Sequence, residues 1–237
     1  MNQIALNLLN SSQSSRLILR LVILSLLSSV IYGYGLMYLN TPLVLFKITS
    51  ILFLTLVVKF YKIFVKDKLI SHLLITALIF HAVGDVIIEI ASSIVYAIPF
   101  FLLGHLIYIA IILRDLKTSY IYSIQRLGLA ILLVTVAAFM GNVFLANLVV
   151  GILYFSIAVY ILVLTTFGVL AVFHPAAVPY IIPGVLLYAA SDCLVAYHRL
   201  LGDLLGYFPL SWPLYYLAQV FIIFGLLKYY SNTTQDR

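Results

Sequence analysis

Residues 147–173 read NLVVGILYFSIAVYILVLTTFGVLAVF and contain no charged side chain. A helix of about 20 mostly apolar residues is long enough to cross the ~30 Å hydrocarbon core of a bilayer. The stretch therefore predicts a membrane-spanning helix. The rest of the chain has the same character, because 65% of its 237 residues are hydrophobic, only 8% are charged, and the mean hydropathy is +1.21.

Seven further apolar runs of spanning length flank this segment. Charged loops or chain-breaking residues separate them, and Gly141-Asn142 is read as such a break. We predict an all-α fold, a polytopic membrane bundle of eight transmembrane helices that forms a single transmembrane domain over residues 1–237. Gly84-Asp85 and Ser191-Asp192 occupy similar places in the third and seventh runs, which suggests four-helix halves, 1–120 and 121–237. The seven runs are 17–32, 43–60, 69–93, 98–113, 127–145, 178–197 and 212–230.

The composition excludes several classes of protein. A soluble globular domain does not reach this hydropathy, and a disordered chain needs low hydrophobicity. A disulfide scaffold needs many cysteines, whereas Cys193 is the only one in the chain and lies inside an apolar run, where packing is its simplest role. The net charge of +6 reports membrane orientation and not a nucleic-acid partner.

The basic residues predict the orientation. Alternating eight spans leaves only Arg199 on one side of the membrane, so by the positive-inside rule both termini are cytoplasmic. The first run is read as a retained helix, since no A-x-A cleavage pattern follows it. Without an endoplasmic retrieval signal, a bacterial inner membrane is the expected location. The residues on the cytoplasmic side are Arg16, Arg20, Lys59, Lys62, Lys66, Lys68, Arg114, Lys117, Arg126, Lys228 and Arg237.

Four ionisable residues lie within the spans: Lys47, Asp85, Glu89 and Asp192. A charge at the centre of a spanning helix costs about 2.5–3.5 kcal/mol on the insertion scale, so such residues normally face a polar interior and mark a functional site. The other acidic residues, Asp67, Asp115, Asp203 and Asp236, are read as loop or tail positions. A rise of ~1.5 Å per residue places the four within the middle-to-outer half of the membrane.

Helical spacing gathers further polar residues into stripes, because residues three, four or seven apart share a face. Small residues beside the charges would let these faces approach each other around a shared cavity. The stripes are His81, Asp85, Glu89 and Ser92; Phe101, Gly104, His105 and Tyr108; Gly184, Tyr188, Ser191 and Asp192; and Tyr215, Tyr216 and Gln219.

Structural interpretations compete with functional ones for several residues. Lys47 is read as snorkelling outward, and Glu89 is read equally well as reaching interfacial water. His81 and His105 are read as packing groups. His198 and Arg199 are placed just outside the seventh helix, as anchors or as a phosphate site. Tyr197, Trp212, Tyr215 and Tyr216 fit an aromatic belt.

The sequence holds no recognised metal motif and no G-x-S-x-G nucleophile elbow. Five segments, in order and suitably spaced, instead resemble the YhhN family of membrane proteins, which includes bacterial and animal lysoplasmalogenases. Glu89 is not part of the family pattern. The segments are FKITSILFL (46–54), HAVGDVII (81–88), FLLGHLIYI (101–109), GVLLYAASDCLVA (184–196) and YYLAQ (215–219).

The resemblance implies an ether hydrolase without a cofactor or metal. It would cleave the vinyl ether bond of a lysoplasmalogen to a fatty aldehyde and glycerophosphoethanolamine or glycerophosphocholine. Asp85 and Asp192 would be its acid and its stabilising base, in an order left open, while Lys47 tunes a carboxylate or binds the phosphate. Residues expected to orient water, the aspartates or the single-chain lipid substrate are His105, Tyr108, Tyr188, Ser191, Tyr216 and Gln219.

Two other functions fit the same residues. A small-solute or proton-coupled transporter also carries carboxylates at the middle of the membrane. A metal-dependent intramembrane lipid amidase or esterase would use them as ligands or bases. A purely structural protein is disfavoured, since the buried carboxylates outnumber Lys47.

Overall fold

The computed structural model describes residues 3–39, 43–61, 67–91, 93–116, 120–202 and 208–232. Throughout these ranges the regular structure is helical, and eight helices are long and apolar enough to span a membrane, which confirms the predicted fold class. The long helices are α1 (Gln3–Tyr34), α2 (Val44–Tyr61), α3 (Lys68–Ile90), α4 (Ile98–Leu116), α5 (Ile124–Leu145), α6 (Ile152–Phe173), α7 (Ile182–Leu201) and α8 (Ser211–Asn232).

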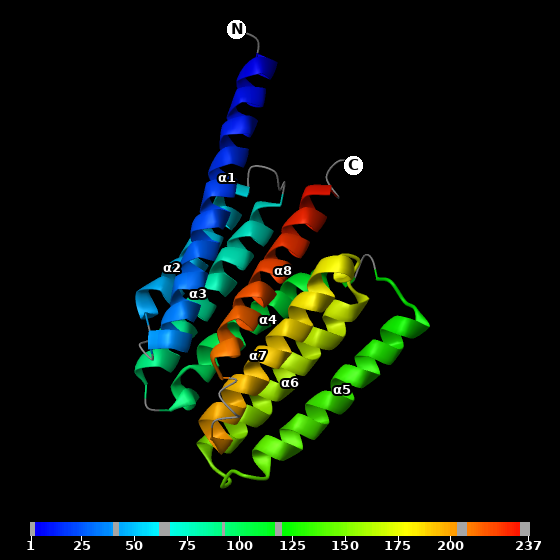
Figure 1. Ribbon diagram of the computed structural model, residues 1–237. Coiled ribbons are helices and arrows are strands. Elements are labelled where there is room, and N and C mark those ends of the chain that lie inside the picture. Colours follow the sequence, from blue (N-terminus) through cyan, green and yellow to red (C-terminus); the bar gives the residue numbers. More distant parts are fainter. Residues whose placement is uncertain are drawn as a thin grey trace.

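The helices pack in a ring that follows the chain only in part. α1, α2, α3 and α4 pack as successive neighbours, α4 then packs on α6, and α7 and α8 bring the chain back to α1 and α2. α5 lies at the periphery, against α6 and α7 (Figure 1). The division into four-helix halves remains a prediction.

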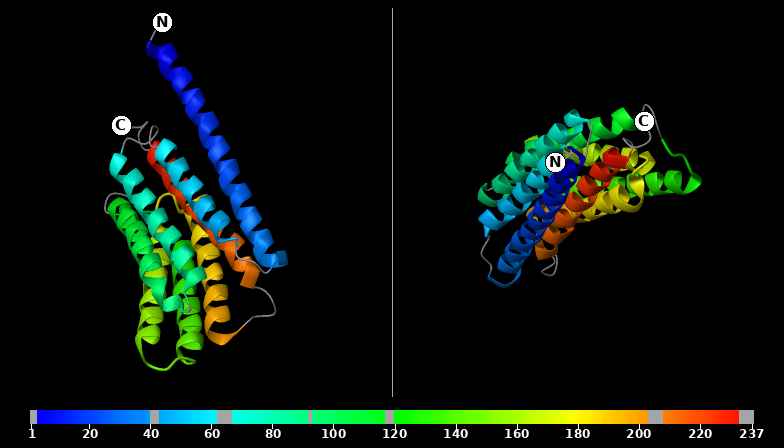
Figure 2. Two further views of the ribbon diagram at one scale, coloured as in Figure 1. Left: turned by 90° about the vertical axis from the view of Figure 1, so that its left-hand side faces the viewer. Right: turned by 90° about the horizontal axis from the view of Figure 1, so that it is seen from above.

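The two ends of the bundle differ. α1 begins and α8 ends at the same end, here named the terminal end, and the first turns of α1 extend beyond the other helices (Figures 1 and 2). The short 3-10 helices Ile94–Tyr96 and Phe208–Leu210 lie at the other, distal end. At the distal end α7 stops at Gly202, whose φ of 106° favours glycine and breaks the helix. His198 and Arg199 thus belong to the last turn of α7, and the prediction that they lie outside it is wrong.

One expected break is also absent. α5 continues through Gly141-Asn142 to Leu145, and α6 begins at Ile152 and not at Asn147. A Cβ at Gly141 would lie 3.7 Å from the side chain of Ile161, so this glycine sits where α5 packs closely on α6. It therefore serves helix packing and not a turn.

A buried polar cluster closes the terminal end. Asp115 lies in α4 and not in a loop, and its carboxylate accepts hydrogen bonds from Tyr230 and from His174 Nε2, the latter at 2.9 Å. His174 Nδ1 accepts the Ala176 backbone N–H at 3.1 Å. Arg126 donates to the carbonyls of Val172 and His174. These contacts join α4, α5, α8 and the α6–α7 connection.

Candidate active site

Lys47 lies inside the bundle between two carboxylates of α3. Its Nζ is 2.8 Å from Glu89 Oε1 and 3.4 Å from Asp85 Oδ1, and only 7% of the lysine is exposed. The helical spacing of Asp85 and Glu89 presents both to α2. The interpretation of Lys47 as a snorkelling residue is therefore wrong, because its charge is neutralised where it lies. Glu89 is a partner of Lys47 and does more than reach interfacial water.

Two tyrosines complete this arrangement, named here the Lys47 cluster. Tyr32 of α1 donates to Glu89 at 2.5 Å, and Tyr215 of α8 donates to Asp85 Oδ2 at 2.9 Å. The rings of Tyr32 and Trp212 each lie 5.4 Å from Lys47 Nζ, within cation–π range. Each carboxylate of the cluster thus accepts from a tyrosine as well as from the ammonium group.

The aromatic residues of α8 lie in the core, contrary to the aromatic-belt interpretation. Trp212, Tyr215 and Tyr216 are all buried, because α8 packs against α7 on one side and against α1 and α2 on the other. Trp212 Nε1 donates to Ser29 of α1, and the Tyr216 hydroxyl shares a hydrogen bond of 2.6 Å with Ser25. Ser25 in turn donates to the Ser50 carbonyl.

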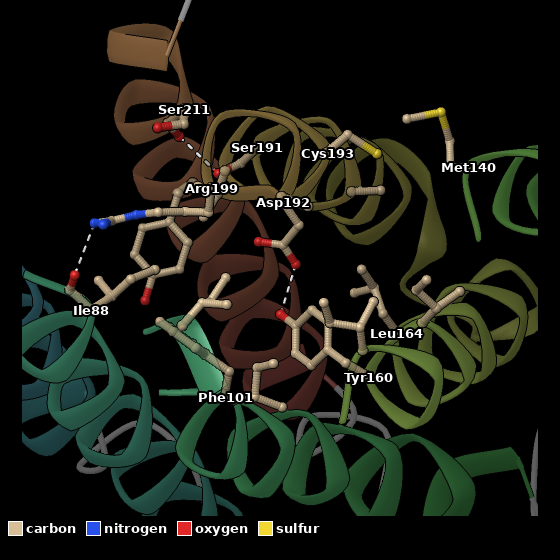
Figure 3. A pocket seen from close by; sticks show the side chains of 18 of the residues that line it. Ile88, Phe101, Met140, Tyr160, Leu164, Ser191, Asp192, Cys193, Arg199 and Ser211 are labelled. Atoms are coloured by element: carbon tan, nitrogen blue, oxygen red, sulfur yellow. Dashed lines mark hydrogen bonds between the residues drawn. The ribbon is translucent and has the colours of Figure 1, made fainter. Parts of the chain in front are cut away.

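Asp192 has a different setting, on α7. Its Oδ2 accepts a hydrogen bond of 2.7 Å from Tyr160 of α6, and the two side chains face each other in the pocket (Figure 3). Among the residues that the structure describes, no cation forms an ion pair with Asp192. The neighbouring Ser191 donates to the Ser211 carbonyl at 2.8 Å, which fixes α7 against the start of α8.

A cavity of about 180 Å³ brings the two aspartates together. Asp85, Glu89 and Lys47 line one part of its wall and Asp192 with Tyr160 another. Arg199 lines it too, near the distal end, and donates to the Ile88 carbonyl at 2.9 Å (Figure 3). The remaining wall is mostly apolar, and α5, α6 and α7 contribute the larger part of it.

A set of buried polar side chains packs beside the cavity without lining it. Tyr108 donates to Gln219 Oε1 at 2.8 Å, and His105 Nδ1 bonds the Phe101 carbonyl at 2.8 Å. The Tyr188 ring lies 4.6 Å from that of His105 and 5.3 Å from that of Tyr215. This layer therefore supports Tyr215 and, through it, Asp85. Within the described part of the chain, the atoms without a hydrogen-bond partner here are both ring nitrogens of His81, His105 Nε2, the Tyr188 hydroxyl and Gln219 Nε2.

The predicted site residues thus fall into three groups. Lys47, Asp85, Ser191 and Asp192 line the cavity. His105, Tyr108, Tyr188 and Gln219 form the layer behind it. Tyr216 belongs to neither, since it joins α8 to α1. Ser92, expected on the Asp85 stripe, lies outside the described residues.

Sequence reasoning missed Tyr160 and did not recognise Tyr32. Each lies in an apolar helix that carries several other hydroxyl side chains, so the sequence does not single it out. The partner carboxylates lie on other helices, 32 and 57 positions away in the chain. Within the described ranges, no three His, Cys, Asp or Glu side chains gather so as to hold a metal ion.

Comparison with known proteins adds one match. The model of the YhhN family matches residues 43–226, which include every cavity-lining residue from α2 to α8. No curated protein and no solved structure matches the chain. Because the match covers well over half of the sequence, the chain belongs to the YhhN family.

Proposed function

We propose that this protein is a lysoplasmalogenase, an ether hydrolase that releases a fatty aldehyde from the vinyl ether bond of a single-chain phospholipid. The observation that carries the proposal is the pair of aspartates on one cavity, Asp85 beside an ammonium group and Asp192 beside a neutral tyrosine. Membership of a lysoplasmalogenase-like family supports the same reaction.

Vinyl ether hydrolysis makes two demands on an enzyme. An acid must protonate the β-carbon, and a negative group must stabilise the oxocarbenium ion that results. Glycosidases meet the same demands with a pair of carboxyl groups, one protonated and one ionised. Two carboxyl groups serve this purpose only when their surroundings differ.

We assign the two roles from the different surroundings of the two aspartates. Lys47 at 3.4 Å and Tyr215 at 2.9 Å both favour the charged form of Asp85, which makes it the ionised stabiliser. Asp192 has a tyrosine and no ammonium beside it, in a largely apolar enclosure that favours the neutral form. Asp192 is therefore the general acid, and Tyr160 is the residue that orients it.

The reaction then proceeds in three steps: protonation, addition of water and collapse of the hemiacetal. The Asp192 proton passes to the β-carbon of the vinyl ether, and the oxocarbenium ion forms next to the Asp85 carboxylate. Water adds to the α-carbon and gives up a proton to Asp85, which yields a hemiacetal. The bond from that carbon to the glycerol oxygen breaks as the hemiacetal hydroxyl gives its proton to Asp192 and the glycerol oxygen takes the proton held by Asp85. Aldehyde and glycerophospho product leave, and both carboxyl groups are back in their starting states.

The head group requires a separate cation. Lys47 already pairs with two carboxyl groups, so it tunes Asp85 and does not bind phosphate. Arg199 lines the same cavity at the distal end, is exposed, and offers more guanidinium donors than the one used by Ile88. We assign the substrate phosphate to Arg199. We propose that the protein lies in a bacterial inner membrane with the terminal end inward, the orientation that the positive-inside rule favours, so the head group would lie in the outer half.

The decisive experiment is an aldehyde-coupled assay with purified protein in detergent. A lysoplasmalogen is compared with the matching alkyl ether and ester lysolipids, with and without a chelator. We expect aldehyde only from the vinyl ether, and an unchanged rate with chelator. Ester cleavage that a chelator abolishes would favour a metallohydrolase. Lysoplasmalogen binding without turnover, together with solute uptake in vesicles, would favour a transporter.

A further inference from the structure

The cavity has one polar part and one long apolar part, which we call the apolar arm. The arm lies between α5, α6 and α7, and Asp192 stands where it meets the polar part. Each helix supplies residues at helical spacing, so the lining forms continuous stripes. The stripes are Leu133, Ala137 and Met140 on α5, and Ile161, Leu164 and Gly168 on α6.

Three contacts fix how these helices lie against one another. Tyr160 bonds Asp192 at 2.7 Å, a Cβ at Gly141 would lie 3.7 Å from Ile161, and a Cβ at Gly168 would lie 3.2 Å from Val185. The first two contacts lie at the same height along the bundle, because Tyr160 and Ile161 are adjacent residues of α6. The third lies eight residues further along α6, ~12 Å closer to the terminal end. The arm therefore runs from Asp192 toward the terminal end.

Small residues widen the apolar arm along its length, and larger residues close its end. Ala137 of α5 and Ala189 of α7 line the middle of the arm. At Gly168 the neighbouring side chains are Val185 and, at 3.6 Å, Leu133. Among the described residues of α5, α6 and α7, none nearer the terminal end than Leu133 and Gly168 lines the cavity. The arm thus ends at these two residues.

The arm also has a side open to lipid. Val136 lines the cavity while 49% of its surface is exposed, and its neighbours on the outer face of α5 are apolar. One leaflet offers ~15 Å of hydrocarbon, half of the ~30 Å core, which is close to the length of the arm. The arm is therefore long enough to hold part of one hydrocarbon tail.

We propose that the apolar arm binds the single alkenyl chain of the substrate, and that Gly168 sets how long a chain the arm accepts. The chain enters beside Val136 between α5 and α7, its vinyl ether lies at Asp192, and its far end lies over Gly168. This inference rests on the proposed function for the identity of the substrate, but binding of a one-chain lipid can be tested without turnover.

The first test uses the unmodified protein, because Cys193 is the only cysteine and lines the cavity next to Asp192, where the arm begins, on the same side as Met140 (Figure 3). A non-hydrolysable alkyl ether lysolipid with an octadecyl chain should slow labelling of Cys193 by an alkyl thiosulfonate at least fivefold. A lysolipid with a butyl chain should not. Equal labelling with and without the long-chain lipid would overturn the proposal, even if aldehyde release were observed.

The second test fills the end of the arm. Gly168→Leu should weaken binding of the octadecyl lysolipid at least tenfold and leave binding of an octyl lysolipid within twofold. Gly128→Leu is the matched control, since Gly128 lies on the exposed face of α5 with no atom within 4 Å of an added Cβ. Equal effects of the two variants, or equal effects on both lipids, would overturn the assignment of Gly168. Length-dependent binding in a protein that never releases aldehyde would instead overturn only the proposed reaction.

Discussion

Asp192 and Asp115 are two aspartates inside the same bundle, and each accepts a hydrogen bond from a tyrosine. Asp115 also accepts a hydrogen bond from His174, and it does not line the cavity that Asp192 faces. Asp192 has Tyr160 and faces the cavity. Being a carboxylate within a spanning helix is thus not a sufficient sign of catalysis. The distinguishing feature is a carboxyl group that faces a space for substrate.

The largest effect is expected for Asp192→Asn. The amide keeps the shape and can still accept from Tyr160, but it has no proton to give the β-carbon. General acid catalysis contributes about 10²–10⁴-fold, so kcat for aldehyde release should fall by about that factor. Steady-state kinetics and the melting temperature in detergent provide the measurement. A variant that keeps wild-type kcat would remove Asp192 from the chemistry.

Asp85→Asn should lower kcat for aldehyde release by nearly as much as Asp192→Asn. It removes the negative charge beside the oxocarbenium ion, and loss of one preorganised electrostatic group typically costs about 10²–10³-fold in kcat. Lys47 keeps Glu89 at 2.8 Å, so the ion pair and the fold should survive. Aldehyde release is measured together with binding of an alkyl ether lysolipid. A loss of binding that matches the loss of rate would show that Asp85 holds substrate and does not stabilise the cation.

Tyr160→Phe removes the hydrogen bond that orients Asp192. One such bond contributes about 1–1.5 kcal/mol, and 1.4 kcal/mol corresponds to a factor of ten, so kcat should fall about tenfold with KM unchanged. The control is Tyr230→Phe, which breaks the tyrosine–aspartate bond of the terminal end. That variant should lower the melting temperature and leave kcat alone. If both variants change kcat equally, Asp192 and Asp115 do not have different roles in the reaction.

The sequence predicts the fold class well because the length and hydropathy of a spanning helix are properties of a single segment. Each of the eight helices is apolar over at least 18 residues, so each can be found without knowing its neighbours. The ring order could not be predicted in this way. It depends on side-chain fit between distant segments, for example Gly141 against Ile161, and a glycine reads equally well as a break or a contact.

The sequence predicts the site residues that are ionisable, because a charge within a spanning helix is conspicuous. It does not predict the residues whose role depends on a hydrogen-bond partner on another helix. Lys47, Asp85 and Asp192 stand out because ionisable groups are rare in spanning helices. Asp115 was misplaced in a loop because it is the penultimate residue of α4, where sequence cannot separate a helix end from a loop. Tyr216 was grouped with Tyr215 since they are adjacent, yet successive helical positions point about 100° apart. Their hydroxyls accordingly reach different helices.

Asp115→Ala tests the other half of the comparison. It leaves Tyr230 and His174 without their acceptor, and an unsatisfied buried polar group costs about 1–3 kcal/mol. We expect a melting temperature several degrees lower and a kcat within threefold of wild type at a temperature where the variant is folded. A folded Asp115→Ala protein that has lost catalysis would mean that the terminal cluster takes part in the reaction.

The smallest effect is expected for Tyr216→Phe, beside Tyr215→Phe as its matched neighbour. The Tyr216 hydroxyl bonds only Ser25 among the contacts described, and Ser25 retains the Ser50 carbonyl, so little is left unsatisfied. Its loss should change the free energy of unfolding by about 1 kcal/mol or less and kcat by less than twofold. Tyr215→Phe removes a donor to Asp85 and should lower kcat severalfold. A larger loss of kcat from Tyr216→Phe than from Tyr215→Phe would place substrate on the α1 side of α8, and the cavity beside Asp192 would no longer be the site of catalysis.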